Sequence, residues 1–110
     1  MEKICCVIVT FNRLSLLKEC IQAVLNQTMS IDKIIIVDNG SRDRSGMIAD
    51  QYAEKDDRIR VLHIRESTIG AGRNAGLNIA RGEYITFLDD DDSLDDDALD
   101  FLYRLSTDED

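Results

Sequence analysis

Four consecutive aspartates, Asp89–Asp92, directly follow the apolar, strand-like run Tyr84–Leu88. Carboxylates that lie a few ångströms apart raise one another's pKa unless a positive charge lies among them. A bound divalent cation would relieve that repulsion, and ligands that are all oxygen suit Mg²⁺ or Mn²⁺ better than zinc. Mg²⁺ usually takes one or two protein carboxylates and completes its shell with water and substrate phosphates. The aspartate run therefore indicates an enzyme that holds a phosphorylated substrate through a metal.

The negative charge of the chain is concentrated in that run and beyond it. The 110 residues carry 13 Lys and Arg against 22 Asp and Glu, a formal net charge of −9. Residues 1–88 contain 12 basic and 11 acidic side chains, whereas residues 89–110 contain 1 and 11. A nucleic-acid-binding protein would carry a basic stripe, and the sequence has none. We therefore expect no nucleic-acid partner.

Two further polar clusters follow apolar runs. Residues 10–13 (Thr-Phe-Asn-Arg) come after the first run, and residues 38–41 (Asp-Asn-Gly-Ser) come after the second. If the runs are parallel strands, these clusters and the aspartates share one edge of a sheet, where ligands bind in open α/β folds. Because loops are polar in most proteins, three such clusters can also arise by chance.

A glycine-rich segment, residues 70–76 (Gly-Ala-Gly-Arg-Asn-Ala-Gly), opens the third predicted helix. Glycines let the backbone approach a ligand or a neighbouring strand closely, and a helix N-terminus favours anions. Arg73 falls in the expected first turn, where a positive charge is unfavourable to the helix dipole unless a phosphate lies nearby. A solvated arginine is the alternative. The segment also matches a relaxed dinucleotide fingerprint, but residues 65–69 separate it from the strand, where that fingerprint needs a tight turn.

The elements that must position these residues alternate along the chain. Apolar, β-branched runs predict four strands, at Ile4–Thr10, Lys33–Asp38, Ile59–Ile64 and Glu83–Leu88. Helical spacing predicts four helices: one after Asn12 as its N-cap, one at Ser45–Lys55, one at Ala71–Arg81 and one after Ser93. This βαβαβαβα order predicts a Rossmann-like α/β fold, in which helices cover both faces of a mainly parallel four-stranded sheet.

The histidine and the cysteines suggest no site of their own. Cys5, Cys6 and Cys20 are odd in number and lack metal-binding spacing, so we interpret them as core thiols of a protein in a reducing compartment. His63, the only histidine, falls in a predicted strand and is interpreted as structural. No run of about 18 apolar residues predicts a membrane span. We expect a cytoplasmic protein that, at full length, lies at the inner face of the membrane.

Four motifs stand in a specific order and spacing: residues 7–13 (VIVTFNR), 34–43 (IIIVDNGSRD), 70–77 (GAGRNAGL) and 82–92 (GEYITFLDDDD). Together they resemble family 2 glycosyltransferases of the GT-A fold, over about residues 3–105. Each motif alone is weak, but the combination is highly specific. The resemblance implies the N-terminal, nucleotide-sugar-binding half of such an enzyme. We expect that domain at residues 1–106 and a disordered acidic tail at residues 107–110.

The resemblance implies nucleotide-binding roles for five residues outside the aspartate run. Thr10 and Phe11 would flank the nucleobase, and Arg13 would lie near the base or a phosphate. Asp38 would accept a hydrogen bond from the base, which is usually uracil in this family. Arg73 corresponds to the family's arginine in the glycine-rich segment and would lie near the phosphates.

The D-x-D motif of the family corresponds to Asp89, Asp90 and Asp91. The resemblance implies that Asp91, together with Asp89, binds Mg²⁺ or Mn²⁺, while Asp89 and Asp90 lie near the ribose and the sugar. A metal that bridges two phosphates stabilises the charge that develops as the glycosidic bond breaks. The family further implies a UDP-linked sugar donor, a saccharide or lipid-linked acceptor, and inversion at the transferred sugar.

The sequence departs from the family after this motif. Residues 93–97 (Ser-Leu-Asp-Asp-Asp) stand where the family usually has a proline. The acceptor-binding half and the catalytic base of an inverting transfer have no counterpart before Asp110. We therefore expect a truncated chain, or a minimal domain, that binds nucleotide and metal weakly and transfers no sugar alone. A half-fold would expose an apolar face, so a homodimer is a further expectation.

Two other interpretations stay open on these residues. One is a non-catalytic module that binds a nucleotide or a metal. The other is a purely structural domain whose aspartates form a solvated helix start, since acidic residues favour a helix N-terminus. Binding of UDP together with Mn²⁺ would separate the structural interpretation from the other two.

Overall fold

The computed structural model describes residues 4–27, 31–81 and 84–89. Its strands are β1 (Ile4–Thr10), β2 (Lys33–Asn39), β3 (Ile59–Ile64) and β4 (Tyr84–Asp89). Its helices are α1 (Leu14–Leu25), α2 (Ser45–Lys55) and α3 (Ile69–Ile79). The helix expected after Ser93 and the tail at residues 107–110 lie outside the described residues. Within the described ranges, no helix is long and apolar enough to cross a membrane.

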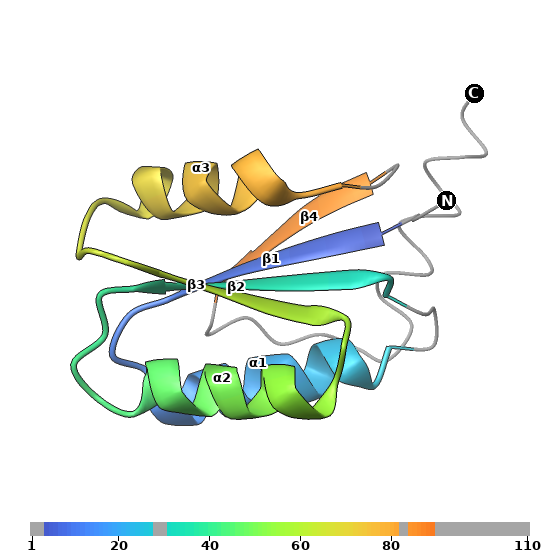
Figure 1. The fold of residues 1–110 in the computed structure, drawn as a ribbon, viewed down its shortest axis with the longest axis horizontal. Helices are drawn as coiled ribbons and strands as arrows, with labels where there is room; N and C mark the ends of the chain where they lie inside the picture. The colour runs from blue at the N-terminus through green and yellow to red at the C-terminus, as the bar shows by residue number, and fades with distance from the viewer. Residues whose placement is uncertain (1–3, 28–30, 82–83, 90–110) are drawn as a thin grey trace.

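The strands form one parallel sheet in the order β3-β2-β1-β4, which confirms the predicted Rossmann-like α/β class. The chain moves outward from β1 through β2 to β3, and then returns past β1 to add β4. Because crossovers between parallel strands are right-handed, this reversal moves the connecting helix to the opposite face. Figure 1 shows the result, with α1 and α2 on one face of the sheet and α3 on the other.

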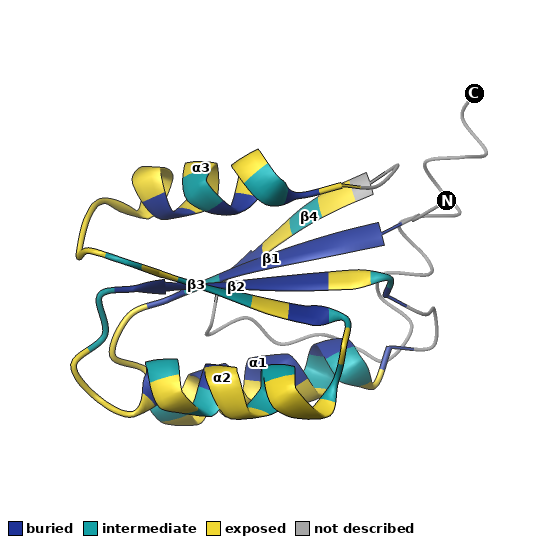
Figure 2. Cartoon of the chain, in the orientation of Figure 1, coloured by how far each residue is buried: buried dark blue, intermediate teal, exposed yellow. Residues whose placement is uncertain are grey.

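The core consists of two apolar layers, one on each face of the sheet. β1 and β2 are buried along nearly their whole length, as Figure 2 shows, and such continuous apolar runs are typical of strands covered on both sides. The layer under α1 and α2 includes Cys6, Ile8, Leu17, Cys20, Ile21, Ile34 and Ile36. The smaller layer under α3 is built on Cys5, Val7, Ile35, Val37 and Ala80.

The helix α3 lies against the sheet through glycines. A Cβ atom on Gly76 would lie 2.4 Å from Cγ1 of Val7, and one on Gly72 would lie 2.9 Å from Cγ1 of Val9. The helix backbone therefore approaches β1 to a distance that only glycine allows. Of the two uses that the sequence left open for this segment, close approach to a strand is the one observed at these positions. A Cβ atom on Gly70, by contrast, would lie 3.9 Å from Oγ1 of Thr68, an ordinary van der Waals contact.

The predicted bounds of α3 are wrong by two residues at each end. The helix begins at Ile69 rather than Ala71 and ends at Ile79 rather than Arg81. The reason is a cap: the Thr68 hydroxyl accepts a hydrogen bond from the Ala71 N–H at 3.1 Å and satisfies a free amide of the first turn. The strands deviate less, since β2 extends one residue further than predicted and β4 begins and ends one residue later.

The prediction that Asn12 caps α1 is also wrong. The N-cap position is Arg13, which makes no side-chain cap hydrogen bond. Asn12 instead adopts a φ of 51°, a left-handed conformation that asparagine tolerates better than most residues. The cap comes instead from the Asp43 carboxylate, in the loop between β2 and α2. It accepts hydrogen bonds from the N–H of Leu14 at 3.3 Å and from the N–H of Ser45 at 2.8 Å. One side chain thus caps both α1 and α2.

Candidate functional site

The strand register brings predicted site residues together at the carboxyl edge of the sheet. Thr10 ends β1 and pairs with Asp38 of β2, while Val9 pairs with Asp89, which ends β4. The chain reverses its direction across the sheet between β1 and β4. In open parallel sheets, ligands bind beside such a switch point. The edge that carries these residues is therefore the candidate site.

The Asp38 carboxylate is buried at this edge and fixed by two hydrogen bonds. Its side chain is 8% exposed. Oδ1 accepts a hydrogen bond from the backbone N–H of Ser41 at 2.9 Å. Oδ2 lies 2.9 Å from Nδ1 of His63 on β3. Because each carboxylate oxygen has two acceptor positions, both oxygens keep the capacity to accept a further hydrogen bond from a ligand.

His63 is a residue of this site that the sequence analysis did not identify. It pairs with Asp38 in the sheet, and its Nε2 lies 2.9 Å and 3.1 Å from the two carboxylate oxygens of Asp50 on α2. The hydrogen bond to Asp38, followed by that to Asp50, raises the pKa of His63 above its ordinary value of about 6.5. One signal was available: Asp38 and His63 each stand near the end of a strand, and neighbouring parallel strands place such residues side by side.

The helix α2 approaches this pair at a glycine. A Cβ atom on Gly46 would lie 2.5 Å from Oδ2 of Asp38 and 3.2 Å from Cε1 of His63. Any side chain at this position would displace the carboxylate or the imidazole. Gly46 is the second residue of α2, so the N-terminal turn of the helix, which favours negative charge, lies directly against Asp38.

The loops at this edge are joined to one another by hydrogen bonds. Asn12, in the β1–α1 loop, accepts at Oδ1 from the backbone N–H of Arg42 at 2.6 Å and of Asp43 at 3.3 Å. The Asn12 N–H donates to Oγ of Ser41 at 3.0 Å. These bonds hold the loop that carries Phe11, one of the predicted base-flanking residues, against the loop that follows Asp38.

Asn39 makes the corresponding connection to the third loop. Its Nδ2 donates to the carbonyl oxygen of Ser67 at 2.9 Å, and its Oδ1 accepts from the Ser67 N–H at 3.0 Å and hydroxyl at 2.9 Å. Ser67 immediately precedes Thr68, the cap of α3. The end of β2 therefore determines where α3 begins.

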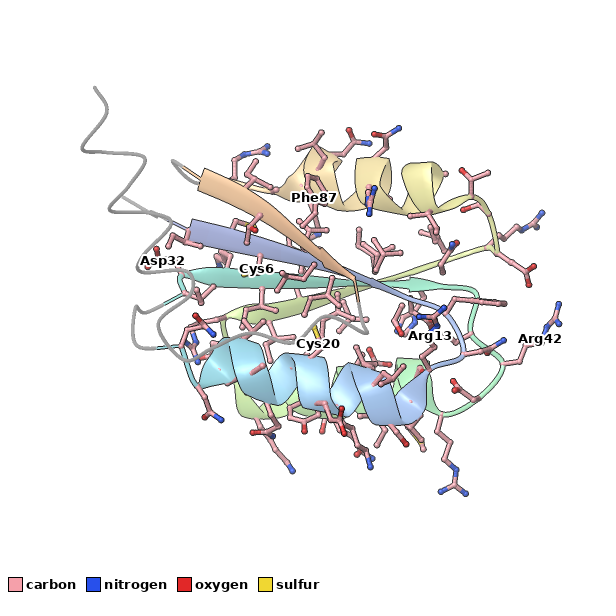
Figure 3. The ribbon with its side chains drawn as sticks, turned by 180° about the vertical axis from the view of Figure 1, so that it is seen from behind. Cys6, Arg13, Cys20, Asp32, Arg42 and Phe87 are labelled. Atoms are coloured by element: carbon pink, nitrogen blue, oxygen red, sulfur yellow. The ribbon has the colours of Figure 1, made fainter. Side chains whose placement is uncertain are left out.

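Of the predicted nucleotide-binding residues, Phe11, Arg13 and Arg73 are exposed, whereas Thr10 is buried. Phe11 is 37% exposed in the β1–α1 loop, where its ring is accessible to a planar base. Figure 3 shows Arg13 and Arg42 at the same end of the molecule, and Arg42 forms an exposed ion pair with Glu66 at 3.3 Å. Arg73 is the fifth residue of α3 and not part of its first turn as predicted, so the helix dipole does not by itself call for a phosphate beside it.

The predicted metal ligands fall at and beyond the end of β4. Asp89 closes that strand, whereas Asp90 and Asp91 lie outside the described residues. Among the residues that are described, no group of three His, Cys, Asp or Glu side chains could hold a metal ion. The chemistry of the run, which is all carboxylate, suits a hard cation such as Mg²⁺ or Mn²⁺, and β4 brings its first member next to β1.

Comparison with known proteins identifies the family of this chain. The family described as Glycosyl transferase family 2 matches residues 5–110. Glycosyltransferase GlyG of Streptococcus pneumoniae is 41% identical over 105 residues, which are 94% of this chain and 35% of that protein.

Solved structures show the same fold at lower sequence identity. S. aureus TarS 1-349 in complex with UDP-GlcNAc has a TM-score of 0.86 and 23% identity, over 96% of this chain and 31% of that one. The mannosyltransferase PcManGT from Pyrobaculum calidifontis, in complex with GDP-Man and Mn²⁺, has a TM-score of 0.70 and 21% identity, over 82% and 28%. The chain thus spans about a third of the length of these proteins. By its sequence match and its GT-A-type sheet, it belongs to glycosyl transferase family 2.

Proposed function

We propose that this chain is the part of a glycosyltransferase that binds the nucleoside-diphosphate sugar. The observation that carries the proposal is the convergence of Thr10, Asp38 and the end of β4 at the switch point of the sheet. The base would lie at Thr10 and Asp38, and the diphosphate would extend toward β4. TarS in complex with UDP-GlcNAc supports uridine diphosphate as the nucleotide.

In this proposal, different residues bind different parts of the nucleotide. Asp38 accepts a hydrogen bond from the imino N–H of uracil, and the exposed ring of Phe11 covers one face of the base. Arg13, in the β1–α1 loop, and Arg73, on α3, offset the charge of the phosphates. Thr10, which is 1% exposed, contributes shape beneath the base rather than charge.

The cation of the proposal is Mg²⁺ or Mn²⁺. Asp91 and Asp89 would hold it, and Asp89 and Asp90 would lie toward the ribose and the sugar. When bound, the cation would offset the negative charge that develops on the diphosphate leaving group. The mannosyltransferase complex that contains GDP-Man and Mn²⁺ has a similar fold and supports a divalent ion at this site.

The transfer step belongs to the proposal as well, because the chain spans about a third of GlyG and of the TarS 1-349 chain. We propose inversion at the sugar, with a saccharide or lipid-linked acceptor in the cytoplasm at the inner membrane face. An inverting transfer needs a base near the acceptor hydroxyl, and we assign that base to no residue of this chain. The 110-residue chain by itself would then bind nucleotide and metal without transferring sugar.

Titration calorimetry with UDP and Mn²⁺ tests the proposal. We expect Asp38→Ala to weaken UDP binding about tenfold, the usual effect of losing one hydrogen bond to a charged group, and to bring the affinities for UDP and CDP together. We expect Asp91→Ala to remove the dependence on Mn²⁺. Asp57→Ala, in the turn between α2 and β3, is the matched control and should change neither. A chain that binds no UDP in the presence of Mn²⁺ would contradict the proposal.

A non-catalytic nucleotide- and metal-binding module is the second candidate. It is favoured by the fact that every role assigned above is one of binding. The two candidates differ in the full-length protein, where a glycosyltransferase would consume a UDP-sugar in the presence of an acceptor and a binding module would not.

A further inference from the structure

We propose that His63, held between Asp38 and Asp50, is a positioning residue that orients the Asp38 carboxylate and makes nucleobase binding depend on the proton carried by its imidazole. This inference rests on the proposed function, in which Asp38 accepts a hydrogen bond from the base. It adds a residue and a form of regulation that the resemblance to the family did not suggest.

The geometry of the imidazole selects its protonated form. Nδ1 of His63 lies 2.9 Å from an oxygen of Asp38, and Nε2 lies 2.9 Å from an oxygen of Asp50. A neutral imidazole carries one N–H, so it can donate to one of these carboxylates and must turn a lone pair toward the other. Only the imidazolium donates to both. The raised pKa of His63, caused first by Asp38 and then by Asp50, agrees with this geometry.

The surroundings of the ring leave its proton free to exchange. Among the described residues, the ionisable groups in contact with it are Asp38 from β2 and Asp50 from α2. Gly46 of α2 also lies against the ring and brings no side chain. The His63 side chain is 47% exposed on β3, an edge strand of the described sheet, so solvent reaches it directly.

The state of His63 decides what Asp38 presents to a ligand. With the Ser41 N–H on one oxygen and the imidazolium N–H on the other, the carboxylate is fixed and acts only as an acceptor. Such a group favours bases with an imino N–H, such as uracil and guanine, over cytosine and adenine, which present a ring nitrogen acceptor there. A site built around a buried polar group rejects ligands that leave that group unpaired.

Loss of the proton weakens this arrangement. In the tautomer that keeps its N–H on Asp50, Oδ2 of Asp38 faces a lone pair of His63 and the carboxylate is no longer held. Nucleobase affinity should therefore fall as pH rises through the pKa of His63. By linkage, a nucleotide that prefers the protonated form must raise that pKa by the same factor.

The 110-residue chain permits a direct test because its single histidine produces one titration curve in NMR spectra. We would follow the ring protons and the Kd of UDP with Mg²⁺ from about pH 5.5 to about pH 8.5, the range in which histidine changes charge. We expect the Kd to rise about three- to tenfold, and saturating UDP to raise the pKa of His63 by the matching half to one unit, roughly. CDP should bind more weakly and raise it less.

Variants show whether the change in UDP affinity with pH comes from His63 or from the phosphates of UDP. They also separate a positioning role of His63 from a merely structural one. His63→Leu removes the hydrogen bond to Asp38 and should weaken UDP binding at every pH. His63→Asn places a neutral N–H near the position of Nδ1, so it should restore binding relative to His63→Leu and lose the histidine-dependent part of the profile. Asp50→Asn should move the profile to lower pH, whereas Glu54→Gln, one turn further along α2, should leave it in place.

Two results would overturn the inference while UDP still binds: a pH profile of His63→Asn identical to that of the unmodified chain, or a pKa of His63 that UDP leaves unchanged. Asp50→Asn changes an exposed residue, so it keeps the test open if the His63 variants fold poorly. Failure of the unmodified chain to bind UDP at any pH would instead contradict the proposed function, and the two failures are therefore distinct.

Discussion

The orientation of the Asp38 carboxylate depends on residues from three other parts of the chain. Ser41 binds one oxygen, His63 binds the other, and Gly46 leaves the space that the carboxylate occupies. None of these three residues has to touch a nucleotide to affect how tightly it binds. Substitutions beside a binding residue should therefore change affinity almost as strongly as substitutions of that residue.

Gly46→Ala tests this dependence. Alanine normally stabilises a helix relative to glycine by about 0.5–1 kcal/mol, but here its Cβ would lie 2.5 Å from Oδ2 of Asp38. We expect a loss of about 1–3 kcal/mol in the free energy of unfolding, as in other overpacked sites, and an affinity for UDP about tenfold lower. Urea unfolding and calorimetry measure the two effects. Wild-type values for both would show that the carboxylate does not need this space.

At the scale of single residues, the sequence allowed Asp38 and Thr10 to be placed at the site edge because each ends or nearly ends an apolar run. His63 could not be assigned in the same way. Its contact with Asp38 depends on which strands are neighbours and in what register, and these are properties of the assembled sheet. The one signal, its position near the end of a strand, does not say which strand lies beside it.

Among the elements, α1 and α2 are coupled through Asp43. Burial acts to raise the pKa of this carboxyl, but the hydrogen bonds from Ser45 and Leu14 outweigh it and hold the pKa below the ordinary value of about 3.9. A lowered folded-state pKa means that the stabilisation is present above about pH 4 and is lost as pH falls through that lowered pKa.

Asp43→Ala should reveal this coupling. We expect the free energy of unfolding to fall by about 1 kcal/mol at neutral pH, the usual effect of losing a helix cap. The difference from the unmodified chain should shrink once the pH is low enough to protonate Asp43. Urea unfolding at neutral and acidic pH provides the comparison, with Asp57→Ala as the control for charge. A difference that is constant with pH would rule out the carboxylate as the cap.

The close contact between α3 and β1 leads to a paired prediction. Gly76→Ala should destabilise the chain by about 1–3 kcal/mol, because its Cβ would meet Val7 at 2.4 Å. Gly70→Ala, on the same helix, would bring its Cβ no closer than 3.9 Å to Oγ1 of Thr68, so it should be neutral or stabilise by up to about 1 kcal/mol. Both are measured by urea unfolding. Equal effects of the two substitutions would mean that α3 does not pack on the strand at Gly76.

The elements themselves were predictable because strands covered on both faces are continuously apolar and helices between them repeat at helical spacing. The residues at which the helices begin were harder to predict. Thr68 carried a capping signal that the glycines beside it obscured. The cap of α1 comes from Asp43, which lies 29 residues after Leu14 in a different loop, and no local pattern around Asn12 could point to it.

At the scale of the whole molecule, apolar side chains are exposed on the face of the sheet that carries α3. Ile85 and Phe87 of β4 pair with Cys5 and Val7, which belong to the layer under α3, and they are 36% and 38% exposed. Figure 3 shows Phe87 on this side of the sheet, and Leu77 of α3 is 45% exposed. Apolar groups that gather on one face favour contact with another protein surface.

We therefore expect the 110-residue chain to self-associate through this face. Sedimentation equilibrium over a range of concentrations should show a dimer, and Phe87→Lys should shift the equilibrium toward monomer. Met47→Lys, at an exposed apolar position on α2, is the matched control and should not. A monomer at every concentration would contradict self-association through this face.

The three buried thiols lie on both sides of the sheet, with Cys5 under α3 and Cys6 and Cys20 under α1 and α2. Burial, reinforced by the neighbouring thiols, raises the pKa of Cys6 to about 12, so it carries almost no thiolate at neutral pH. Alkylation must then wait until the protein opens locally. Labelling rates resolved to single residues, which separate Cys5 from the adjacent Cys6, would consequently report how often each helical layer opens and would report the α3 layer separately from the other.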